Sequence, residues 1–425
     1  MARILVRSAQ DPRKIYPPVQ ASRRMGGNSG NLLYANAVFR ALSTSGTRVV
    51  PGGFDAHTLE DPTEWVERIN RRFDRYVMPM SNAFRFPFSE GLARMTRIVQ
   101  QLDMPVTVVG VGAQTTADAA ENESFRMGRT GSDKLPSAAA LAKHDRTVRA
   151  FADAVLDKSE SIGVRGELTK RYLVSLGVDA SRVDVIGCPS IFTWGPGLRV
   201  RTDMPGLTSR SRISMNVDYR VGGIGPIVER NAAAYKRLTS PSQDARSARM
   251  IINGSEGRST DHWDPATPIH TGHVLYRTKR LFFYPNPWGW IEDLARYDFV
   301  FGNRLHGNIA GIIGGTPAHL LAHDSRTREL AEYHGIPYTL MSDLSEPPLA
   351  EELYGRTDYT RFNELMPERF ATYLDFLHRN GLETVFDEGQ DNGAAFDETI
   401  EKGRKVRAVR PTITPIDKVL RRVGR

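Results

Sequence analysis

An arginine and a histidine, Arg304 and His306, stand where a buried strand is predicted to end and a helix to begin. Residues 299–302 form an apolar run typical of a strand, and residues 305–313 have helical spacing. A helix N-terminus favours anions, and the guanidinium of Arg304 suits a carboxylate or a phosphate. His306 could exchange a proton near neutral pH, and Gly307 would let a ligand approach the backbone. The pattern indicates an anion site with a proton donor; structural hydrogen bonds of the same residues are the alternative.

A second arginine, Arg165, occupies an equivalent position in the first half of the chain. It ends the predicted strand at 161–165 and precedes helical spacing at 167–176. Two guanidinium groups that face one cleft would suit a ligand with two anionic groups. The alternative is a structural arginine that pairs with Glu167.

The glycine-rich loop after the first predicted strand, residues 3–6, also precedes a helix. It contains Asn28, Gly30 and Asn31, but neither a Gly-x-Gly-x-x-Gly pattern nor a Walker lysine. The loop is therefore no dinucleotide or nucleoside triphosphate fingerprint. We interpret it either as a ligand contact or as a turn that caps the helix.

Other residues that could take part in catalysis or binding show weaker patterns. His262, His270 and His273 match no ligand spacing, so we predict no metal site. Cys188 is the single cysteine, which excludes intrachain disulfides and cysteine-based zinc or iron–sulfur sites. We interpret Cys188 as a packed small residue, whereas Ser190 could cap a turn or contact a ligand.

Strands and helices alternate in both halves of the chain, which predicts an α/β fold with two Rossmann-like parallel-sheet domains facing a cleft. Ligands bind beyond the carboxyl ends of the strands in such sheets, so the loops described above should line the cleft. Residues 249–253 are among the predicted strands, and the polar residues 114–136 are predicted to form a loop near the mouth of the site. The predicted organisation is an N-terminal domain (1–195), a linker (196–211), a C-terminal domain (212–345), a helical region (346–385) and a basic, mobile tail (386–425).

The chain of 425 residues has a formal net charge of +8, and the surplus of positive charge lies at its ends. Residues 1–24 carry a surplus of 5 and residues 401–425 a surplus of 7, so a nucleic-acid-binding core is not indicated. We interpret the basic C-terminal tail either as solvated or as a peripheral contact with an anionic membrane. No apolar run approaches the ~20 residues of a membrane span, and the first residues read as a strand rather than a signal peptide. The expected location is the cytoplasm, with the inner face of the membrane as an option.

Several short segments, taken in order, resemble the polysaccharide pyruvyl transferase family. They are residues 28–31, 110–114, 161–167, 185–190, 304–307, 315–317 and 324–326. The resemblance implies a GT-B-like pair of Rossmann domains and phosphoenolpyruvate as co-substrate, without another cofactor. The family's phosphoenolpyruvate contacts would fall on Arg165, Arg304 and His306, with His306 as the proton donor.

The strand-end loops and the resemblance together define the expected site. Catalysis is assigned to Arg165, Arg304 and His306. Substrate binding is assigned to Asn28, Gly30, Asn31, Gly112, Gln114, Ser190, Gly307 and Asn308. The expected reaction transfers a pyruvyl group from phosphoenolpyruvate to two hydroxyls of a sugar in polysaccharide or glycolipid biosynthesis.

The partners that this reaction requires are phosphoenolpyruvate and a glycan, glycolipid or glycoside acceptor, and no nucleic acid. Two alternatives stay open at this point. One is a GT-B glycosyltransferase that uses a nucleotide sugar, and the other is a non-catalytic relative that binds a sugar or a phosphate.

Overall fold

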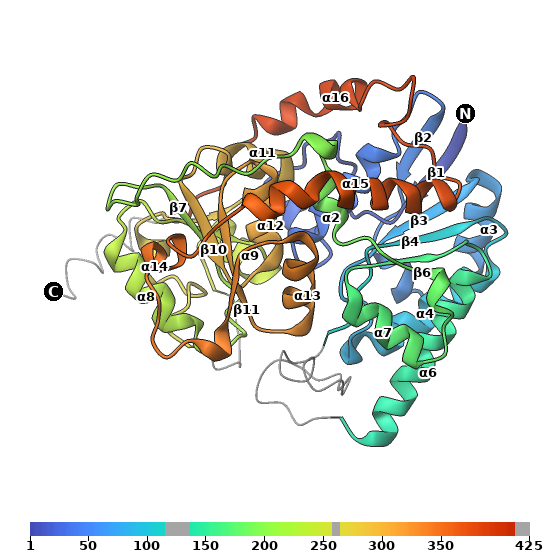
Figure 1. The fold of residues 1–425 in the computed structure, drawn as a ribbon, viewed down its shortest axis with the longest axis horizontal. Coiled ribbons are helices and arrows are strands. Elements are labelled where there is room, and N and C mark those ends of the chain that lie inside the picture. Colours follow the sequence, from blue (N-terminus) through green and yellow to red (C-terminus); the bar gives the residue numbers. More distant parts are fainter. Residues whose placement is uncertain (115–135, 257–263, 413–425) are drawn as a thin grey trace.

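The computed structural model describes residues 1–114, 136–256 and 264–412, and it contains parallel sheets in two lobes (Figure 1). All strand pairs within the named sheets are parallel. Most strands are short apolar runs whose side chains are mostly buried, as expected for parallel sheets covered by helices. The predicted α/β fold with two Rossmann-like, GT-B-like lobes is confirmed.

The first lobe is built on six strands. They are β1 (Ala2–Val6), β2 (Thr47–Pro51), β3 (Arg75–Pro79), β4 (Val106–Val109), β5 (Ile162–Val164) and β6 (Val183–Val185). The order is β2-β1-β3-β4, and a bridge between Val111 and Val164 extends it to β5 and β6. The order reverses between β1 and β3, where a sheet of this kind opens a crevice for ligands.

The helices of the first lobe alternate with these strands. They are α1 (Pro18–Arg23), α2 (Gly30–Ala41), α3 (Thr63–Arg72), α4 (Ser89–Gln101), α6 (Ala138–Leu156) and α7 (Glu167–Ser175). Helix α2 begins directly after the glycine-rich loop, and α7 begins two residues after Arg165. The glycine-rich loop and the loop with Arg165 therefore each lead into a helix N-terminus.

The second lobe repeats the scheme with six further strands. They are β7 (Ile213–Asn216), β8 (Ser240–Ser242), β9 (Leu281–Phe283), β10 (Phe299–Gly302), β11 (Ala318–Ala322) and β12 (Tyr338–Leu340). The order is β12-β11-β10-β7, and a bridge between Ser214 and Thr239 adds β8 and β9. The order reverses between β7 and β10, so the second crevice lies at the loops that follow these two strands.

The helices of the second lobe and of the C-terminal region are α8 (Ile224–Ala234), α9 (Ala245–Asn253), α10 (Val274–Arg277), α11 (Pro287–Leu294), α12 (Leu305–Ile313), α13 (Ser325–His334), α14 (Ala350–Tyr354), α15 (Thr360–Arg379) and α16 (Ala394–Arg404). Helix α15 extends along both lobes (Figure 1). No helix among the described residues combines the length and the apolar character that a membrane crossing requires.

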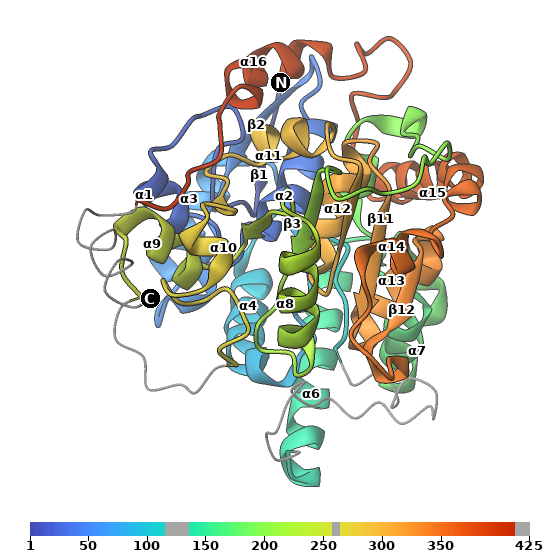
Figure 2. The same ribbon diagram turned by 90° about the vertical axis from the view of Figure 1, so that its left-hand side faces the viewer.

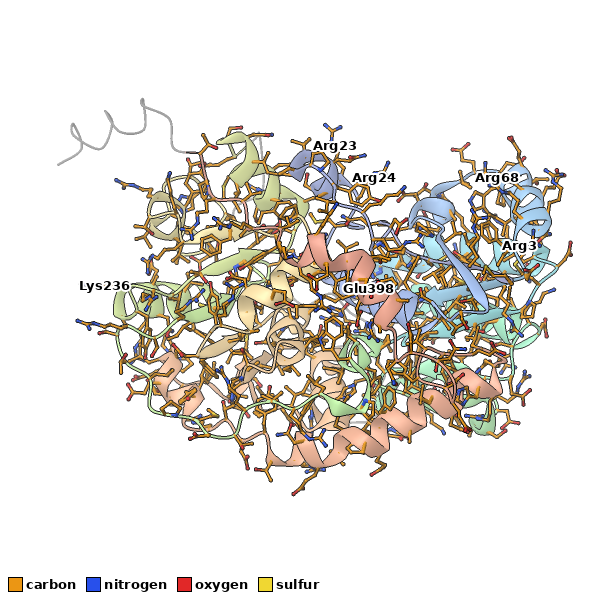
Figure 3. All side chains as sticks on the ribbon, turned by 90° about the horizontal axis from the view of Figure 1, so that it is seen from above. Arg3, Arg23, Arg24, Arg68, Lys236 and Glu398 are labelled. Carbon is orange, nitrogen blue, oxygen red and sulfur yellow. The ribbon has the colours of Figure 1, made fainter. Side chains whose placement is uncertain are left out.

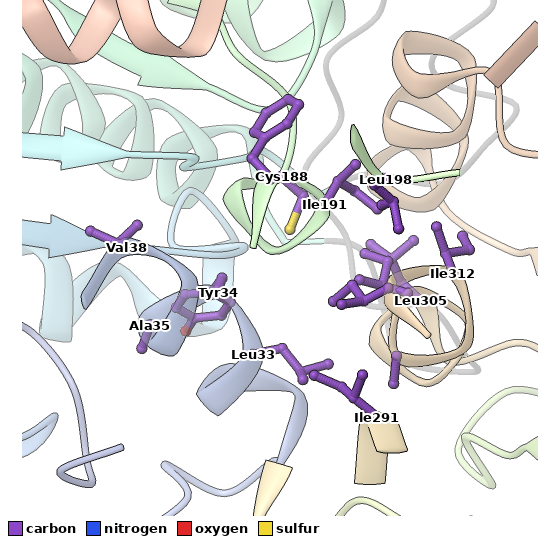
Figure 4. Close-up of a cluster of buried hydrophobic side chains, with 14 of the residues drawn as sticks. Leu33, Tyr34, Ala35, Val38, Cys188, Ile191, Leu198, Ile291, Leu305 and Ile312 are labelled. Carbon is purple, nitrogen blue, oxygen red and sulfur yellow. The ribbon is translucent and has the colours of Figure 1, made fainter. Parts of the chain in front are cut away.

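One buried apolar cluster is shared by the two lobes (Figure 4). Leu33 and Tyr34 come from α2 of the first lobe, Ile191 follows β6, and Leu305 and Ile312 come from α12 of the second lobe. Burial of such side chains holds the helices together at about 25 cal/mol per Å² of apolar surface. The cluster thus fixes the start of α2 and the start of α12, which carry candidate loops, close to each other.

The predicted tail from residue 386 differs from the structure. Residues Ala394–Arg404 form α16, and Arg40 of α2 forms an ion pair of 2.7 Å with Asp397. The ring of Phe396 lies 6.2 Å from that of Trp288 in α11. The many basic residues of this stretch predict a solvated tail, but its apolar residues pack against both lobes.

The predicted strand at 249–253 is wrong, because these residues end helix α9. Asp244 caps this helix by accepting a hydrogen bond from the backbone N–H of Ser247. Ala248 and Ile251 form the buried side, at helical spacing. The consecutive apolar residues resembled a strand, but the N-cap starts a helix earlier in the sequence. Most of the predicted loop at 114–136, His262 and the tail beyond Thr412 lie outside the described residues.

Candidate active site

Arg304 precedes α12 at the crevice between β7 and β10. Its Nε donates a hydrogen bond of 2.9 Å to the carbonyl oxygen of Val217, which follows β7. Nη2 lies 3.7 Å from Oδ1 of Asp218 and 3.8 Å from Oδ2 of Asp244, distances too long for hydrogen bonds. The side chain is buried, yet Nη2 has no hydrogen-bond partner within the described residues. The guanidinium therefore keeps donor capacity for a ligand.

His306 lies in the first turn of α12 and faces the first lobe. Its ring centroid is 5.6 Å from that of Tyr34, and its Nε2 is 3.9 Å from Sγ of Cys188. Figure 4 shows Tyr34 and Cys188 in the buried cluster between the lobes. Burial, and after it the positive charges of Arg165 and Arg326, holds the pKa of His306 well below its usual range. The imidazole is therefore neutral at neutral pH.

Arg165 reaches the same aromatic ring from the first lobe. Its guanidinium carbon lies 5.7 Å from the ring centroid of Tyr34, and the residue is fully buried. Nε donates to the carbonyl oxygen of Gly110 at 2.7 Å, and Nη2 donates to that of Met80 at 3.2 Å. Nη1 has no partner in the described part of the chain. The structure thus places Arg165 and His306 against one tyrosine.

A third arginine, Arg326, belongs to this group, and the sequence analysis did not assign it to the site. Its Nη2 lies 3.3 Å from Oδ2 of Asp324, while its buried Nε has no partner among the described residues. Its charge lowers the pKa of both Arg165 and His306, although burial is the larger cause for each. Arg326 follows β11 and opens α13, so the strand-end rule that selected Arg304 would also have selected it.

The loop with Asn28, Gly30 and Asn31 docks onto the second lobe. Asn28 forms an antiparallel bridge with Asp244. A Cβ on Gly30 would lie 2.5 Å from Cβ of His306, so a larger residue would push the loop away. Oδ1 of Asn28 accepts a hydrogen bond of 2.8 Å from the N–H of Gly30, and the amide of Asn31 donates to a carbonyl of the loop at 2.9 Å. The asparagines shape the loop, and Gly30 sets its distance from His306.

Gly112 and Gln114 support the site from the loop after β4. A Cβ on Gly112 would lie 3.2 Å from Cδ of Arg165, so the glycine gives that side chain room. Nε2 of Gln114 donates a hydrogen bond of 3.1 Å to Oδ2 of Asp324 in the second lobe. Gln114 therefore links the lobes and orients the carboxylate beside Arg326.

Ser190, Gly307 and Asn308 are also engaged within the protein. Oγ of Ser190 lies 3.3 Å from Sγ of Cys188, which donates to it. A Cβ on Gly307 would overlap the side chain of Asn216. Nδ2 of Asn308 donates to two backbone carbonyl oxygens at 2.9 and 3.0 Å, while its buried Oδ1 has no partner within the described residues. These residues hold the first turn of α12 and the loop after β6 in place.

Glu329 of α13 joins the lobes, and the sequence analysis missed it. Its carboxylate accepts hydrogen bonds from the backbone N–H of Thr169 at 3.1 Å and from the Thr169 hydroxyl at 2.7 Å. Burial raises the pKa of Glu329 to about 7, against the opposing effects of Thr169 and Arg165. The partners are 160 residues apart in the chain, so no local pattern could have revealed the contact.

His270 and His273, outside the site, have structural partners. The ring of His273 accepts a hydrogen bond of 3.1 Å from the N–H of Leu275 at the start of α10. His270 contacts the carbonyl oxygen of Pro265 at 2.8 Å. Within residues 1–114, 136–256 and 264–412, no group of three or more His, Cys, Asp or Glu side chains is arranged to hold a metal ion.

These features define an α/β protein of two Rossmann-like lobes with buried arginines and a histidine at their junction. A sequence model of polysaccharide pyruvyl transferases matches residues 28–325. The chain therefore belongs to the polysaccharide pyruvyl transferase family, which confirms the general prediction of a pyruvyl transferase. The match includes Arg165, Arg304 and His306.

Solved structures of similar arrangement were also found, at low sequence identity. An uncharacterized protein from Klebsiella pneumoniae is 14% identical, with 80% of this chain and 92% of that chain covered and a TM-score of 0.38. S. aureus MnaA with UDP is 10% identical, with 95% and 96% covered and a TM-score of 0.40. Anabaena HepE with UDP and glucose is 10% identical, with 95% and 100% covered and a TM-score of 0.39. No significant match was found among curated protein sequences.

Proposed function

We propose that the protein transfers the pyruvyl group of phosphoenolpyruvate to two hydroxyl groups of one sugar and so forms a cyclic ketal. Family membership supports pyruvyl transfer in general. The finer statement is carried by one observation: Arg165, Arg304 and Arg326 each keep a buried guanidinium nitrogen without a partner among the described residues. Buried donors normally have partners, and an anion with several acceptor oxygens would supply them.

Phosphoenolpyruvate suits this set of donors by its charge. It carries a carboxylate and a phosphate on the same carbon, and guanidinium groups bind both kinds of group through paired hydrogen bonds. Arg165 belongs to the first lobe, and Arg304 and Arg326 belong to the second. A donor held among them would lie beside His306 and across the junction of the lobes.

The reaction needs an acid and two sugar hydroxyls. Protonation of the vinyl carbon forms the methyl group and leaves an oxygen-stabilised cation at C2. The first hydroxyl adds to C2 and loses its proton, and the bond between C2 and the phosphate oxygen then breaks. The second hydroxyl adds to the renewed cation and loses its proton, which closes the ketal. One proton is retained in the methyl group, and one leaves with the phosphate.

His306 is the proposed acid, although it is neutral in the free protein. Its pKa is lowered by burial and by Arg165 and Arg326. A bound phosphate dianion beside it would counter the charge of the arginines and favour the imidazolium. Donor binding would therefore bring a proton with it, so that His306 becomes an acid only when there is a substrate to protonate.

Incubation of the purified protein with phosphoenolpyruvate and a panel of glycosides tests the proposal. We expect phosphate release that depends on the glycoside, together with the mass gain of one pyruvyl ketal on the sugar. Phosphate release without a modified sugar would indicate hydrolysis, and neither product with any glycoside class would contradict the proposal.

A thermal-shift experiment distinguishes the donor from a nucleotide sugar. A ligand that binds the native state raises the free energy of unfolding, by about 2.7 kcal/mol at one hundred times its dissociation constant. We expect phosphoenolpyruvate to raise the melting temperature and UDP- or GDP-sugars to leave it unchanged. The reverse result would favour a glycosyltransferase.

A further inference from the structure

The segment around α1 exposes aliphatic and basic side chains together. Ile15 is 49% exposed and Val19 is 46% exposed, which is unusual for large aliphatic residues in this chain. Lys14, Arg23 and Arg24 are exposed beside them. Val19 and Arg23 are one helical turn apart, so they lie on the same outward side of α1. These five residues are called the α1 face below.

The inner side of α1, opposite the α1 face, is packed against the rest of the protein. Ala21 and Ser22 form the buried side of α1, and Met25 after it is fully buried. Helix α1 contacts α9 of the second lobe. Figure 2 shows α1, α9 and α10 on the same side of the molecule, and Figure 3 shows Arg23 and Arg24 at its edge. The aliphatic residues are therefore held outward by a fixed structure.

The charge around the α1 face is positive. Lys14, Arg23 and Arg24 form no ion pair within the described residues. The acidic residue of the same segment, Asp11, is already paired with Arg13 at 2.8 Å. Arg249 of α9 adds an exposed cation on the neighbouring helix, and the backbone of Thr412 lies beside Gly254 at the end of α9.

We propose that the α1 face docks on an anionic lipid bilayer. Anionic headgroups attract basic side chains close to the surface, with a gain in binding of roughly fivefold for each of them. Exposed aliphatic side chains beside them can enter the boundary between headgroups and acyl chains. A nucleic acid would use the cations but would offer no apolar environment to Ile15 and Val19. A bilayer surface uses both kinds of side chain.

The α1 face lies near the candidate site, so docking on a bilayer would affect which sugar acceptors reach that site. The chain runs from Arg24 directly into the loop that contains Gly30, which packs against His306. Asp244, at the start of α9, lies 3.8 Å from Arg304. A bilayer against α1 and α9 would therefore border the candidate site, and sugars carried on lipids would be presented there. This consequence for the acceptor depends on the proposed function, whereas the docking does not.

Vesicle sedimentation with the full-length protein tests the docking. We expect binding to mixed phosphatidylcholine–phosphatidylglycerol vesicles, little binding to pure phosphatidylcholine, and a loss of binding as salt rises. Arg23→Glu/Arg24→Glu should lower the partition coefficient by about tenfold or more. Ile15→Ser/Val19→Ser should lower it at least severalfold at unchanged charge.

Matched variants control for general effects of charge and polarity. Lys236→Glu/Arg237→Glu reverses another adjacent, exposed basic pair at the end of α8, and Figure 3 shows Lys236 away from Arg23 and Arg24. Val174→Ser changes an aliphatic residue that is 39% exposed on α7. Both should bind vesicles like the unaltered protein.

Two results would overturn the inference. One is no preference of the unaltered protein for anionic vesicles, which would leave an acidic protein as the partner of this face. The other is unchanged binding in the α1-face variants together with its loss when Lys418, Arg421, Arg422 and Arg425 are replaced by glutamine. Phosphate release with a water-soluble glycoside should be equal in all variants, so a failure of docking is distinguishable from a failure of the proposed reaction.

Discussion

Arg165 in the first lobe and Arg304 in the second lobe stand at the same kind of junction between a strand and a helix, but their surroundings differ in charge. Arg165 is held by the neutral carbonyl oxygens of Gly110 and Met80. Arg304 is held by one carbonyl oxygen and lies within 4 Å of the carboxylates of Asp218 and Asp244. Arg165 thus forms no ion pair within the described residues, although the charge of Glu329 acts on it, whereas two carboxylates within 4 Å partly neutralise Arg304.

The difference indicates a division of labour between the lobes. Burial alone would raise the pKa of Asp218, but Arg304 and Arg220 outweigh it and lower that pKa. The carboxylate is therefore ionised and shares the charge of Arg304. An incoming anion must compete with Asp218 at Arg304, whereas at Arg165 it meets carbonyl oxygens and Glu329, whose carboxyl is partly protonated near neutral pH because its pKa is raised to about 7. We expect Arg165 to contribute more to anion affinity and Arg304 more to orientation.

The largest expected effect is at His306, which belongs to the second lobe but contacts Tyr34 of the first. We predict that His306→Gln lowers turnover by about 10²–10⁴-fold, because a positioned acid is lost while the volume of the side chain is nearly kept. The affinity for phosphoenolpyruvate should fall much less. Steady-state kinetics of phosphate release, with calorimetric titration of phosphoenolpyruvate, measure the two separately.

The uptake of a proton provides a control for the role of His306. Titrations in two buffers of different ionisation enthalpy should show proton uptake on binding of phosphoenolpyruvate by the unaltered protein, and none by His306→Gln. His378→Gln, in an exposed part of α15, should behave like the unaltered protein. Normal turnover in His306→Gln would exclude the assignment of the acid.

The comparison of the arginines is tested by exchanging each for lysine. Lysine keeps the charge but loses the planar fork of donors. We predict that Arg165→Lys weakens binding of phosphoenolpyruvate by about 100-fold, within the about 1.5–3 kcal/mol of a hydrogen bond to a charged group. Arg304→Lys should weaken binding by about tenfold, since Asp218 and Asp244 already offset part of its charge. Isothermal calorimetry measures both dissociation constants.

A variant of Asp218 tests whether the nearby carboxylate explains the difference between the two arginines. Asp218→Asn removes the nearer competing carboxylate, so it should strengthen binding of phosphoenolpyruvate in the unaltered background but not in Arg304→Gln, where no charge is left for Asp218 to offset. Folding should be checked by melting temperature, because Asp218 also binds Arg220 at 2.7 Å. Equal losses of affinity in Arg165→Lys and Arg304→Lys would contradict the division of labour.

The sequence allowed prediction of those features of the candidate site that depend on neighbouring residues in the chain, such as where a strand ends and a helix begins. An apolar run followed by helical spacing locates a strand end, and Arg165 and Arg304 were chosen as candidates because ligands bind at such ends of parallel sheets. The same rule would have found Arg326. Glu329 and Tyr34 could not be found, because their roles arise only when α13 meets α7 and when α2 meets α12. The misread residues 249–253 show the related limit, since a short apolar run does not distinguish a strand from the buried side of a helix.

Glu329 gives the contact between the lobes a dependence on pH. Its pKa is raised to about 7 by burial, from an ordinary value near 4.5, so the native state binds its proton more tightly than the unfolded chain. The resulting stabilisation is complete below about pH 4.5 and is lost as the pH rises through about 7. We predict that the free energy of unfolding of Glu329→Gln, relative to that of the unaltered protein, increases by about 1–3 kcal/mol as the pH rises from 5 to 8. Urea unfolding at several pH values measures the difference.

The variant must be compared with the unaltered protein at each pH, because buried histidines make the free energy of unfolding depend on pH in the opposite direction. Burial lowers the pKa of His306, and of His334 to about 3, so their contribution to stability is lost as the pH falls below about 6.5. Glu332→Gln, on the exposed side of α13, is the matched control and should parallel the unaltered protein. A constant difference between Glu329→Gln and the unaltered protein across this pH range would show that Glu329 does not titrate there.

The smallest expected effect is at Cys188, a residue of the first lobe whose Sγ faces Nε2 of His306. The distance of 3.9 Å is at the limit for a hydrogen bond with sulfur, and the charges of Arg165 and Arg326 act on the same ring. If these charges set the protonation of His306, Cys188→Ser should change turnover by less than about threefold and leave its pH profile in place. Ser190→Ala, which removes the acceptor of the thiol but leaves the sulfur, serves as the control. A loss comparable to that of His306→Gln would mean that the thiol takes part in the proton transfer, and the first lobe would then supply acid chemistry as well as charge.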